Sequence, residues 1–443
     1  MLEINVAMPS GRSETLSIPQ SSKVGDLKAL IQKSFEQQFL RLVTAEGHAL
    51  TDLTESLESL GIQDGDTLTA LALQVKIAAT GSAFALWCCG GSTLLTWGDR
   101  DSGGDSSIVQ DRINGVIQVK GTFGAFAAVL ANGSVVTWGA TDFGGDSSKV
   151  QELRNVQQVH TSDRAFAAIL MDGSIVAWGD PASGGDISTV RDQLRHVQHV
   201  QATELAFAAI LADGSVITWG DPDYGGDSSE VRDQLRNVQQ VQATFAAFAA
   251  LLADGSVVTW GNPFQGGDSS EVQGQLRRVQ HVQAAKGGAF AALLADGSVV
   301  TWGNVLCLGD SAPGQLRNVQ QLQATALAFA AILSDGSVAA FGDLEDGGDS
   351  SAVQDQLVNV RQLCATDNGA FAALRADGSV VTWGNPYYGG DSSVVQEQLK
   401  NVQQIAATDG AFAAILDDGS LVTWGNRDRG GDSSAVQDLL ANL

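Results

Sequence analysis

The sequence predicts a mainly β fold in which nine similar units of about 41 residues follow a smaller domain. Trp-Gly pairs, once replaced by Phe-Gly, recur at nearly constant spacing, and each closes a stretch like residues 247–261, AFAALLADGSVVTWG. This period is typical of stacked supersecondary units that bury their apolar faces only against one another. The pairs begin at Trp97, Trp138, Trp178, Trp219, Trp260, Trp302, Phe341, Trp383 and Trp424.

One unit is expected to contain three strands. Residues 238–242 alternate polar and apolar side chains, and residues 247–252 are apolar at every position and rich in alanine. A strand that is apolar on both faces is buried between neighbouring sheets, and alanine lets those sheets approach closely. Asp254-Gly255 predicts a tight hairpin turn because glycine supplies a positive φ. The β-branched residues of 256–260 then favour a third strand.

A loop of four variable residues follows each Trp-Gly pair and leads into the pentapeptide GGDSS or a close variant. In the fourth unit, Val231 and Leu235 are four residues apart, and Asp227 or Ser228 is suited to cap a short helix over 228–235. The repeated aspartate also invites a calcium interpretation. Helix capping is favoured because the clustered acidic spacing of a calcium loop is missing from the sequence.

The motif Asp-Gly-Ser-Val-Val-Thr-Trp-Gly, the loop ending in Gly-Gly and the returning strand Asn-Val-Gln-Gln-Val resemble the short-repeat branch of the regulator-of-chromosome-condensation superfamily. The resemblance covers residues 74–443 and implies a β-propeller, as in bacterial β-lactamase-inhibiting propellers with similarly trimmed blades. Propellers usually have four to eight blades. Nine closing blades, fewer blades with loose ends and an open superhelix all remain possible, and we expect a propeller-like ring.

Residues 1–73 follow a different pattern and predict a separate domain. Residues 2–6 and 14–18 alternate around a Pro-Ser-Gly turn, which indicates a β-hairpin. Val24, Leu27, Leu30 and Ile31 form one helical stripe. Short strands are expected at 40–43 and 67–71.

This order of elements resembles ubiquitin, with matches at the helix stripe, at Arg41-Leu42-Val43 and at Gly61-Ile62. The resemblance implies a β-grasp domain that stays part of the chain, because no Gly-Gly end follows Leu73. It further implies a protein-docking patch at Met8, Val43 and Leu71, possible partners being a ubiquitin receptor or a proteasome-type protein. Alternatively, these side chains cover the domain's own core or pack on the repeats. The short connection at Leu73-Gln74 predicts a restricted hinge.

Chain direction places the first-to-second strand turns and the loops after Trp-Gly at one end of every unit, and the Asp-Gly turns at the other. The loops after Trp-Gly vary from unit to unit and hold all three tyrosines. Aromatic side chains on rigidly mounted loops are good binding anchors. The alternative is that these loops drift because nothing constrains them. The candidate protein-binding residues are Phe143, Tyr224, Phe264, Tyr387 and Tyr388.

Composition narrows the classes of partner and compartment. The formal net charge of −25 argues against nucleic acid or an anionic membrane as the main partner, because both need a basic footprint. The sequence has no apolar run of transmembrane length, and Glu3 does not suit a signal peptide. Four cysteines without metal-site spacing are read as buried thiols. A cytoplasmic or nuclear protein is expected.

Catalytic motifs are not evident, and we expect no enzyme activity and no cofactor. The five histidines hold no common repeat position, and GGDSS lacks the lysine of a phosphate loop. Three functions compete: a non-enzymatic adaptor linked to the ubiquitin system, a guanine-nucleotide exchange factor for a small GTPase, and a non-catalytic relative of HECT-type ubiquitin ligases. The second rests on fold analogy alone. We favour the adaptor.

Overall fold

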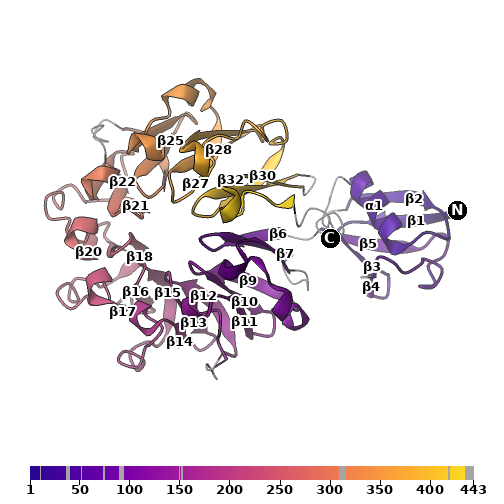
Figure 1. Ribbon diagram of the computed structural model, residues 1–443, viewed down its shortest axis with the longest axis horizontal. Helices are drawn as coiled ribbons and strands as arrows, with labels where there is room; N and C mark the ends of the chain where they lie inside the picture. The colour runs from indigo at the N-terminus through magenta and orange to yellow at the C-terminus, as the bar shows by residue number, and fades with distance from the viewer. Residues whose placement is uncertain are drawn as a thin grey trace.

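A computed structural model describes residues 1–9, 11–35, 40–50, 52–72, 75–88, 94–148, 150, 153–308, 316–417 and 420–434. It shows a five-stranded sheet with one helix, followed by nine three-stranded sheets arranged in a ring (Figure 1). The hinge expected at Leu73-Gln74 and the altered repeat segment at 309–315 lie outside the described residues. The fold is mainly β, as predicted.

The first domain is a mixed sheet covered on one face by a helix. Its strand order is β2-β1-β5-β3-β4, in which β1 and β5 run parallel. Val24, Leu27, Ile31 and Phe35 of the helix are buried against the sheet. The helix extends four residues beyond the predicted stripe. The elements are β1 (Leu2–Ala7), β2 (Ser13–Ile18), α1 (Val24–Phe35), β3 (Leu40–Val43), β4 (Ala49–Leu50) and β5 (Thr67–Ala72).

Each of the nine blades is one antiparallel sheet built from a contiguous stretch of chain. Blades 1 to 3 are β6 (Val75–Ala79), β7 (Ala83–Cys88), β8 (Leu94–Gly98); β9 (Val116–Gly121), β10 (Ala125–Leu130), β11 (Val135–Gly139); and β12 (Val156–Thr161), β13 (Ala165–Leu170), β14 (Ile175–Gly179). Blades 4 to 6 are β15 (Val197–Ala202), β16 (Ala206–Leu211), β17 (Val216–Gly220); β18 (Val238–Ala243), β19 (Ala247–Leu252), β20 (Val257–Gly261); and β21 (Val279–Ala285), β22 (Ala289–Leu294), β23 (Val299–Gly303). Blades 7 to 9 are β24 (Val319–Ala324), β25 (Ala328–Leu333), β26 (Val338–Gly342); β27 (Val360–Ala365), β28 (Ala370–Arg375), β29 (Val380–Gly384); and β30 (Val402–Ala407), β31 (Ala411–Leu416), β32 (Leu421–Gly425).

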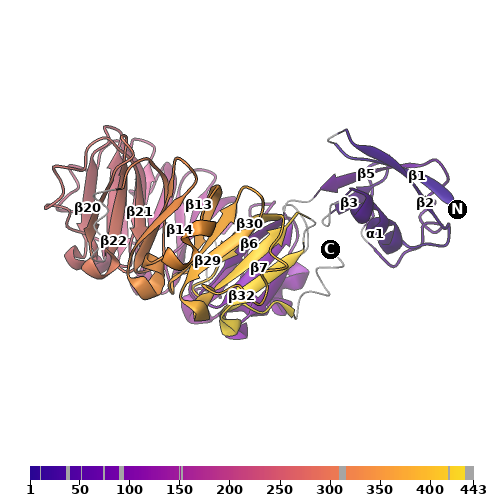
Figure 2. The same cartoon turned by 90° about the horizontal axis from the view of Figure 1, so that it is seen from above.

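Short helical turns follow the third strand of every blade and lie along one face of the ring (Figure 2). They are η1 (Arg100–Gly104), η3 (Thr141–Phe143), η4 (Pro181–Ser183), η5 (Pro222–Tyr224), η6 (Pro263–Gln265), η7 (Val305–Cys307), η9 (Leu344–Gly348), η11 (Pro386–Tyr388) and η12 (Arg427–Arg429).

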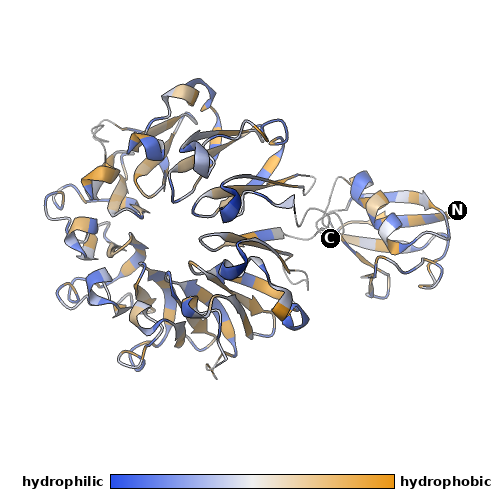
Figure 3. Ribbon diagram, viewed as in Figure 1, coloured by the Kyte–Doolittle hydropathy of each residue, from blue (hydrophilic) through white to orange (hydrophobic). Residues whose placement is uncertain are grey.

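The middle strand of each blade forms the core, as its continuous apolar sequence predicts. In β19, Ala247 to Leu251 are all buried, and their alanines allow the sheets on both sides to pack closely. The Asp-Gly turn that follows has Gly255 at φ +78°, where glycine carries no steric penalty. Colouring by hydropathy shows apolar residues along the blades and polar ones in the turns at their edges (Figure 3).

Adjacent blades are held together by a contact among tryptophan, glycine and phenylalanine, which we call the Trp–Gly link. The Trp260 indole nitrogen donates to the Gly225 carbonyl of the preceding blade at 3.1 Å, and Phe248 stacks on Trp260 with ring centroids 5.1 Å apart. A Cβ at Gly225 would lie 2.7 Å from the Phe248 ring, so only glycine fits. The same indole bond joins Trp97 to Gly430, Trp138 to Gly103, Trp178 to Gly144, Trp219 to Gly184, Trp302 to Gly266, Trp383 to Gly347 and Trp424 to Gly389.

The bond between Trp97 and Gly430 closes the ring. Trp97 belongs to blade 1 and Gly430 to blade 9, and the two atoms are 3.2 Å apart. Phe84 and Leu86 of blade 1 pack in one apolar cluster with Ala411 and Ile415 of blade 9. All nine blades therefore form a closed propeller, although no blade combines strands from the two ends of the repeat region.

The interface between blades 6 and 7 departs from this pattern on both sides at once. Blade 7 has Phe341 where the other blades have tryptophan, and blade 6 has Leu308 at the position of the accepting glycine. Phe341 still stacks on Phe329 at 5.3 Å, and Leu308 packs against the same apolar cluster. Apolar contact replaces the indole bond at this interface.

The helix predicted over 228–235 is not formed. The segment is a run of turns in which the Leu235 amide donates to the Val231 carbonyl at 3.2 Å. The equivalent segments of blades 1 and 7 form short 3₁₀ helices, η2 (Ser107–Arg112) and η10 (Ser351–Gln356). A stretch this short does not offset the cost of nucleating an α-helix. The Asp227 carboxylate accepts from the Ser229 amide at 2.9 Å, so the aspartate closes a local turn instead of capping a helix.

Replacing Trp260 by Phe is expected to lower the free energy of unfolding by about 1–3 kcal/mol, because it leaves the buried Gly225 carbonyl without its donor. Trp87→Phe is a matched control. The Trp87 indole nitrogen is a buried donor with no hydrogen-bond partner in the described part of the chain. Its removal is expected to change stability by less than about 1 kcal/mol. Urea denaturation measures both, and an equal loss in the two variants would contradict the role of the Trp–Gly link.

Candidate functional site

One face of the propeller carries two sets of segments, which we call the inner turns and the outer loops. The inner turns join the first and second strands of each blade, and the outer loops are the helical turns after the third strand. In blade 5, the Thr244 hydroxyl donates to the Gln265 carbonyl at 2.8 Å and accepts from the Ala247 amide at 3.1 Å. Both sets therefore lie at the same end of the blade, as chain direction predicts, and we call this end the loop face.

Most outer loops share one backbone frame, but blade 2 has Ala140 in place of the capping side chain and blade 6 has Leu308 in place of the glycine. In blade 5, the Asn262 side chain accepts from the Phe264 amide at 3.0 Å, and Gly266 ends the turn at φ +94°. An aspartate or asparagine caps the equivalent turn in seven other blades. The frame fixes the backbone and leaves the third residue of each loop free to vary.

Two of the predicted aromatic residues project from this frame. Phe264 is 84% exposed and Tyr387 is 65% exposed, and both are the third residues of their loops. Large aromatic side chains with this much exposure on a rigid mount are suited to bind a partner.

The other three predicted residues also stabilise the loop face. Phe143, Tyr224 and Tyr388 are fourth residues of their loops and are half-buried. Tyr224 packs on Phe245 of the next blade with ring centroids 5.4 Å apart. Phe143 contacts Phe123 at 5.8 Å, and Tyr388 contacts Tyr387 at 5.1 Å. These residues are therefore packed at the loop face instead of being fully exposed to solvent.

The nine inner turns meet around the propeller axis. From blade 1 to blade 9, each turn is joined to the next by a backbone hydrogen bond, as from the Phe123 amide to the Asp163 carbonyl at 2.9 Å and from the Asp163 amide to the Glu204 carbonyl at 3.0 Å. The turns of all blades except blade 7 line a cavity of about 390 Å³, which we call the axial cavity. In each turn, the residue just after the Thr, Ser or Ala that opens it varies. These residues are Gly81, Phe123, Asp163, Glu204, Phe245, Lys286, Ala326, Asp367 and Asp409.

Four of these nine residues are acidic and one is basic. The Lys286 ammonium forms an ion pair with Asp367, two blades further along the chain. Although burial opposes its charge, the carboxylates of Asp367 and Asp409 hold the pKa of Lys286 above its ordinary value. Burial, together with the nearby Asp163 carboxyl, raises the pKa of Glu204 to about 7. Burial and the neighbouring Asp367 likewise raise the pKa of Asp409 to about 7.

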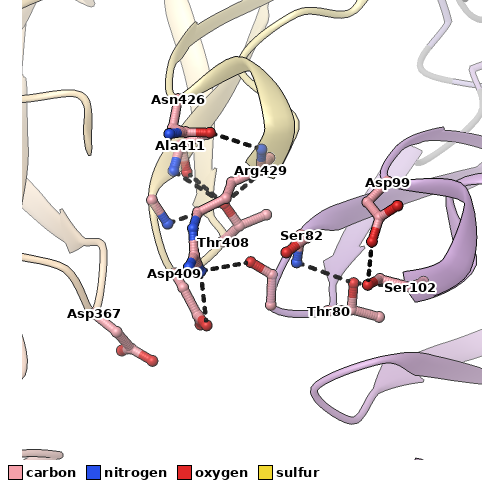
Figure 4. Close-up of polar contacts among 12 residues, drawn as sticks. Thr80, Ser82, Asp99, Ser102, Asp367, Thr408, Asp409, Ala411, Asn426 and Arg429 are labelled. Carbon is pink, nitrogen blue, oxygen red and sulfur yellow. Dashed lines mark hydrogen bonds and ion pairs between the residues drawn. The ribbon is translucent and has the colours of Figure 1, made fainter. Parts of the chain in front are cut away.

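The interface between blades 9 and 1, which we call the seam, borders the axial cavity (Figure 4). The Arg429 guanidinium donates to the Gly81 carbonyl of blade 1 at 3.2 Å and to the Asp409 carboxylate at 3.4 Å. The Arg429 carbonyl also accepts from the Thr408 hydroxyl at 2.9 Å. One side chain thus ties the first inner turn, the last inner turn and the last outer loop together.

Sequence reasoning missed the inner turns because it searched the loops after Trp-Gly. A usable signal was present. When the units are aligned on Trp-Gly, the residues just after the Thr, Ser or Ala that opens each turn vary from unit to unit, whereas the alanine that begins the second strand does not. The search also favoured aromatic side chains and so passed over the exposed aliphatic residues Val305, Leu306 and Leu344.

In the first domain the three predicted docking residues are not brought together. Val43 and Leu71 lie on the adjacent strands β3 and β5. Each is next in sequence to a residue buried under the helix, Leu42 or Ala70. Because side chains alternate along a strand, Val43 and Leu71 lie on the sheet face away from the helix. Met8 instead packs partly against the domain core. Two of the three residues therefore share a surface.

Other site types find little support in the described part of the chain. Cys88 and Cys307 are buried thiols and Cys364 is half-buried. Within the described ranges, His, Cys, Asp and Glu side chains form no group of three or more that is arranged to hold a metal ion. The helices in these ranges are all too short or too polar to cross a bilayer.

The solved structures to which this chain is similar include repeat proteins and a small domain. Prp20p from Saccharomyces cerevisiae matches with 16% identity over 70% of this chain and 81% of its own, at a TM-score of 0.38. The CRINKLY WD40 ectodomain of the Arabidopsis thaliana receptor kinase ACR4 matches with 16% identity over 61% of this chain and 97% of its own, at a TM-score of 0.36. A ubiquitin-like domain from Arabidopsis thaliana matches with 21% identity over 16% of this chain and 73% of its own, at a TM-score of 0.15.

No family model matches the chain, and no curated protein matches it either. The structural likenesses are too distant to carry function, which has to come from the residues of this chain.

The raised pKa values predict a loss of stability with rising pH. An acid whose pKa is higher in the folded chain than in the unfolded chain binds more protons when folded, so stability is lost as pH rises between the two values. For Glu204 that window runs from 4.5 to about 7. Glu204→Gln is expected to lessen the fall in unfolding free energy between about pH 5 and 8 by roughly 1 kcal/mol or less.

The exposed Glu345→Gln serves as the control and is expected to follow the wild-type curve. Urea denaturation at a series of pH values measures all three proteins. A Glu204→Gln curve parallel to wild type would show that this carboxyl is ionised in the folded chain throughout the range.

Proposed function

We propose that this protein is a non-enzymatic adaptor that binds a client protein on the loop face of its propeller. The observation that carries the proposal is the contrast within each outer loop. The frame of capping side chain, helical turn and glycine is complete in seven of the nine blades, whereas the exposed third residue is an aspartate in four blades and a glutamate, an alanine or a large apolar residue in the other five. A rigid scaffold that presents dissimilar side chains on one rim is suited to recognition.

The first domain is proposed as a second protein-docking module, linked to the ubiquitin system by its resemblance to ubiquitin. Its support is the pair Val43 and Leu71, which are half-buried on the sheet face without the helix. Two docking modules in one chain would bring a client and a second protein together without chemistry by this chain.

Loss of two exposed aromatic residues is expected to abolish client capture. Full-length protein and its Phe264→Ala/Tyr387→Ala variant are crosslinked in cell lysate, and bound proteins are quantified by mass spectrometry. Because both side chains are exposed, the variant is expected to fold as wild type, and truncating two central anchors is expected to weaken binding at least about tenfold.

The control is Ile108→Ala/Val394→Ala, which removes two comparably exposed apolar residues outside the outer loops. Equal recovery of every bound protein by all three chains would contradict binding through the loop face. If the captured protein is a small GTPase whose nucleotide release the full chain accelerates, the protein is an exchange factor and not an adaptor.

A further inference from the structure

Large exposed apolar side chains on the outer loops, all of which lie within the described ranges, are confined to four consecutive blades. Blades 5 to 8 carry them at the second or third position of the loop, and we call these five residues the apolar arc. They are Phe264 (84% exposed), Val305 (75%), Leu306 (64%), Leu344 (69%) and Tyr387 (65%). Contiguous exposed apolar groups of this kind mark interaction sites on soluble proteins.

The rest of the rim is acidic at the same positions. The third loop residue is an exposed aspartate in four of the other five blades, namely Asp428, Asp101, Asp142 and Asp223. Arg427 and Arg100, which stand beside the seam, are paired with Asp432 and Asp105. The apolar arc is therefore bordered by negative charge at both of its ends.

Negative charge also lies on the axial side of the rim. The inner turns contribute the carboxyl groups of Asp163, Glu204, Asp367 and Asp409, with Lys286 already engaged by Asp367. Because their pKa values are about 7, Glu204 and Asp409 are only partly ionised at neutral pH. The chain as a whole carries a formal net charge of −25. A partner that covers the apolar arc thus meets carboxylates along the neighbouring rim and towards the axis.

We propose that the apolar arc is the docking surface for a protein segment whose apolar side chains are flanked by lysine or arginine. This inference rests on the proposed adaptor function and names the chemistry of its client. The apolar side chains supply most of the affinity, and the flanking cations speed association and select the partner. A second copy of this chain fits poorly, because its own acidic rim would face the acidic rim of the first.

The test uses a library of random twelve-residue peptides displayed on phage and selected against the full-length chain. Enriched sequences are expected to combine Lys or Arg with Leu, Phe or other large apolar residues. The peptides are then synthesised with a fluorescent label, and their dissociation constants are measured by anisotropy. Raising the salt concentration from 0.05 to about 0.5 M is expected to weaken binding, since it screens the charge attraction.

The variant Phe264→Ser/Leu306→Ser/Leu344→Ser/Tyr387→Ser is expected to bind the selected peptides at least about tenfold more weakly. The control variant Ile108→Ser/Met171→Ser/Val394→Ser removes three comparably exposed apolar residues outside the arc and is expected to bind as wild type. Circular dichroism and urea midpoints establish that both variants fold.

Failure of the inference and failure of the adaptor function give different results. Acidic or uncharged enriched peptides that still depend on the arc overturn the basic partner and leave the adaptor in place. A concentration-dependent dimer that the arc variant abolishes also overturns the basic partner, because it assigns the arc to a second copy of this chain, and it leaves the adaptor function in place. Absence of enrichment, or equal binding by wild type and arc variant, overturns the inference. If client capture is also insensitive to Phe264 and Tyr387, the adaptor function fails as well.

Discussion

The Trp–Gly link is the interaction on which the rest of the structure depends. A three-stranded blade cannot bury its middle strand alone, because Ala247 to Leu251 and their equivalents are apolar on both faces. Glycine at position 225 lets the Phe248 ring approach the backbone of the preceding blade, and the indole of Trp260 then satisfies the Gly225 carbonyl that this approach buries. Packing and hydrogen bonding therefore depend on the same three residues. The joint change to Leu308 and Phe341 supports this view, since the glycine and the tryptophan are replaced together at the one interface that departs from the pattern.

Ring closure follows from repeating this link and not from a special clasp. Trp97 binds Gly430 as every other tryptophan binds the glycine before it, so the seam resembles the remaining interfaces. Arg429 adds a polar tie between the Gly81 carbonyl and the Asp409 carboxylate on the loop face. Closure has a functional consequence, because residues of the first and last blades become neighbours around one axis. Acidic groups as far apart in sequence as Asp163 and Asp409 then share one cavity, which keeps their pKa values high.

Local features of this fold could be predicted from the sequence, whereas features set by the angle between blades could not. The alternating and apolar stretches identified all three strands, and Asp254-Gly255 identified the turn at Gly255, because these signals depend only on neighbouring residues. The period near 41 residues says nothing about the rotation from one blade to the next, so the closed ring of nine stayed one of three possibilities. The helix expected at 228–235 failed since a spacing of four residues also fits a run of turns. The sequence could not decide whether Met8 joins Val43 and Leu71 or covers the domain's own core, because that depends on how the chain turns at the end of β1, where Met8 packs partly against the core.

The loop face separates stability from recognition by a single step along the chain. The fourth residue of an outer loop packs against the neighbouring inner turn, as Tyr224 does on Phe245 and Gln265 does against Gly288. The third residue leaves the same backbone but points outwards, as Phe264 shows. Substitution at the third position therefore changes the surface that a partner meets while the contacts between blades persist. A repeated frame can thus carry acidic, aliphatic and aromatic side chains on one rim, and the division of that rim into an apolar arc and an acidic remainder requires no change in the blades beneath it.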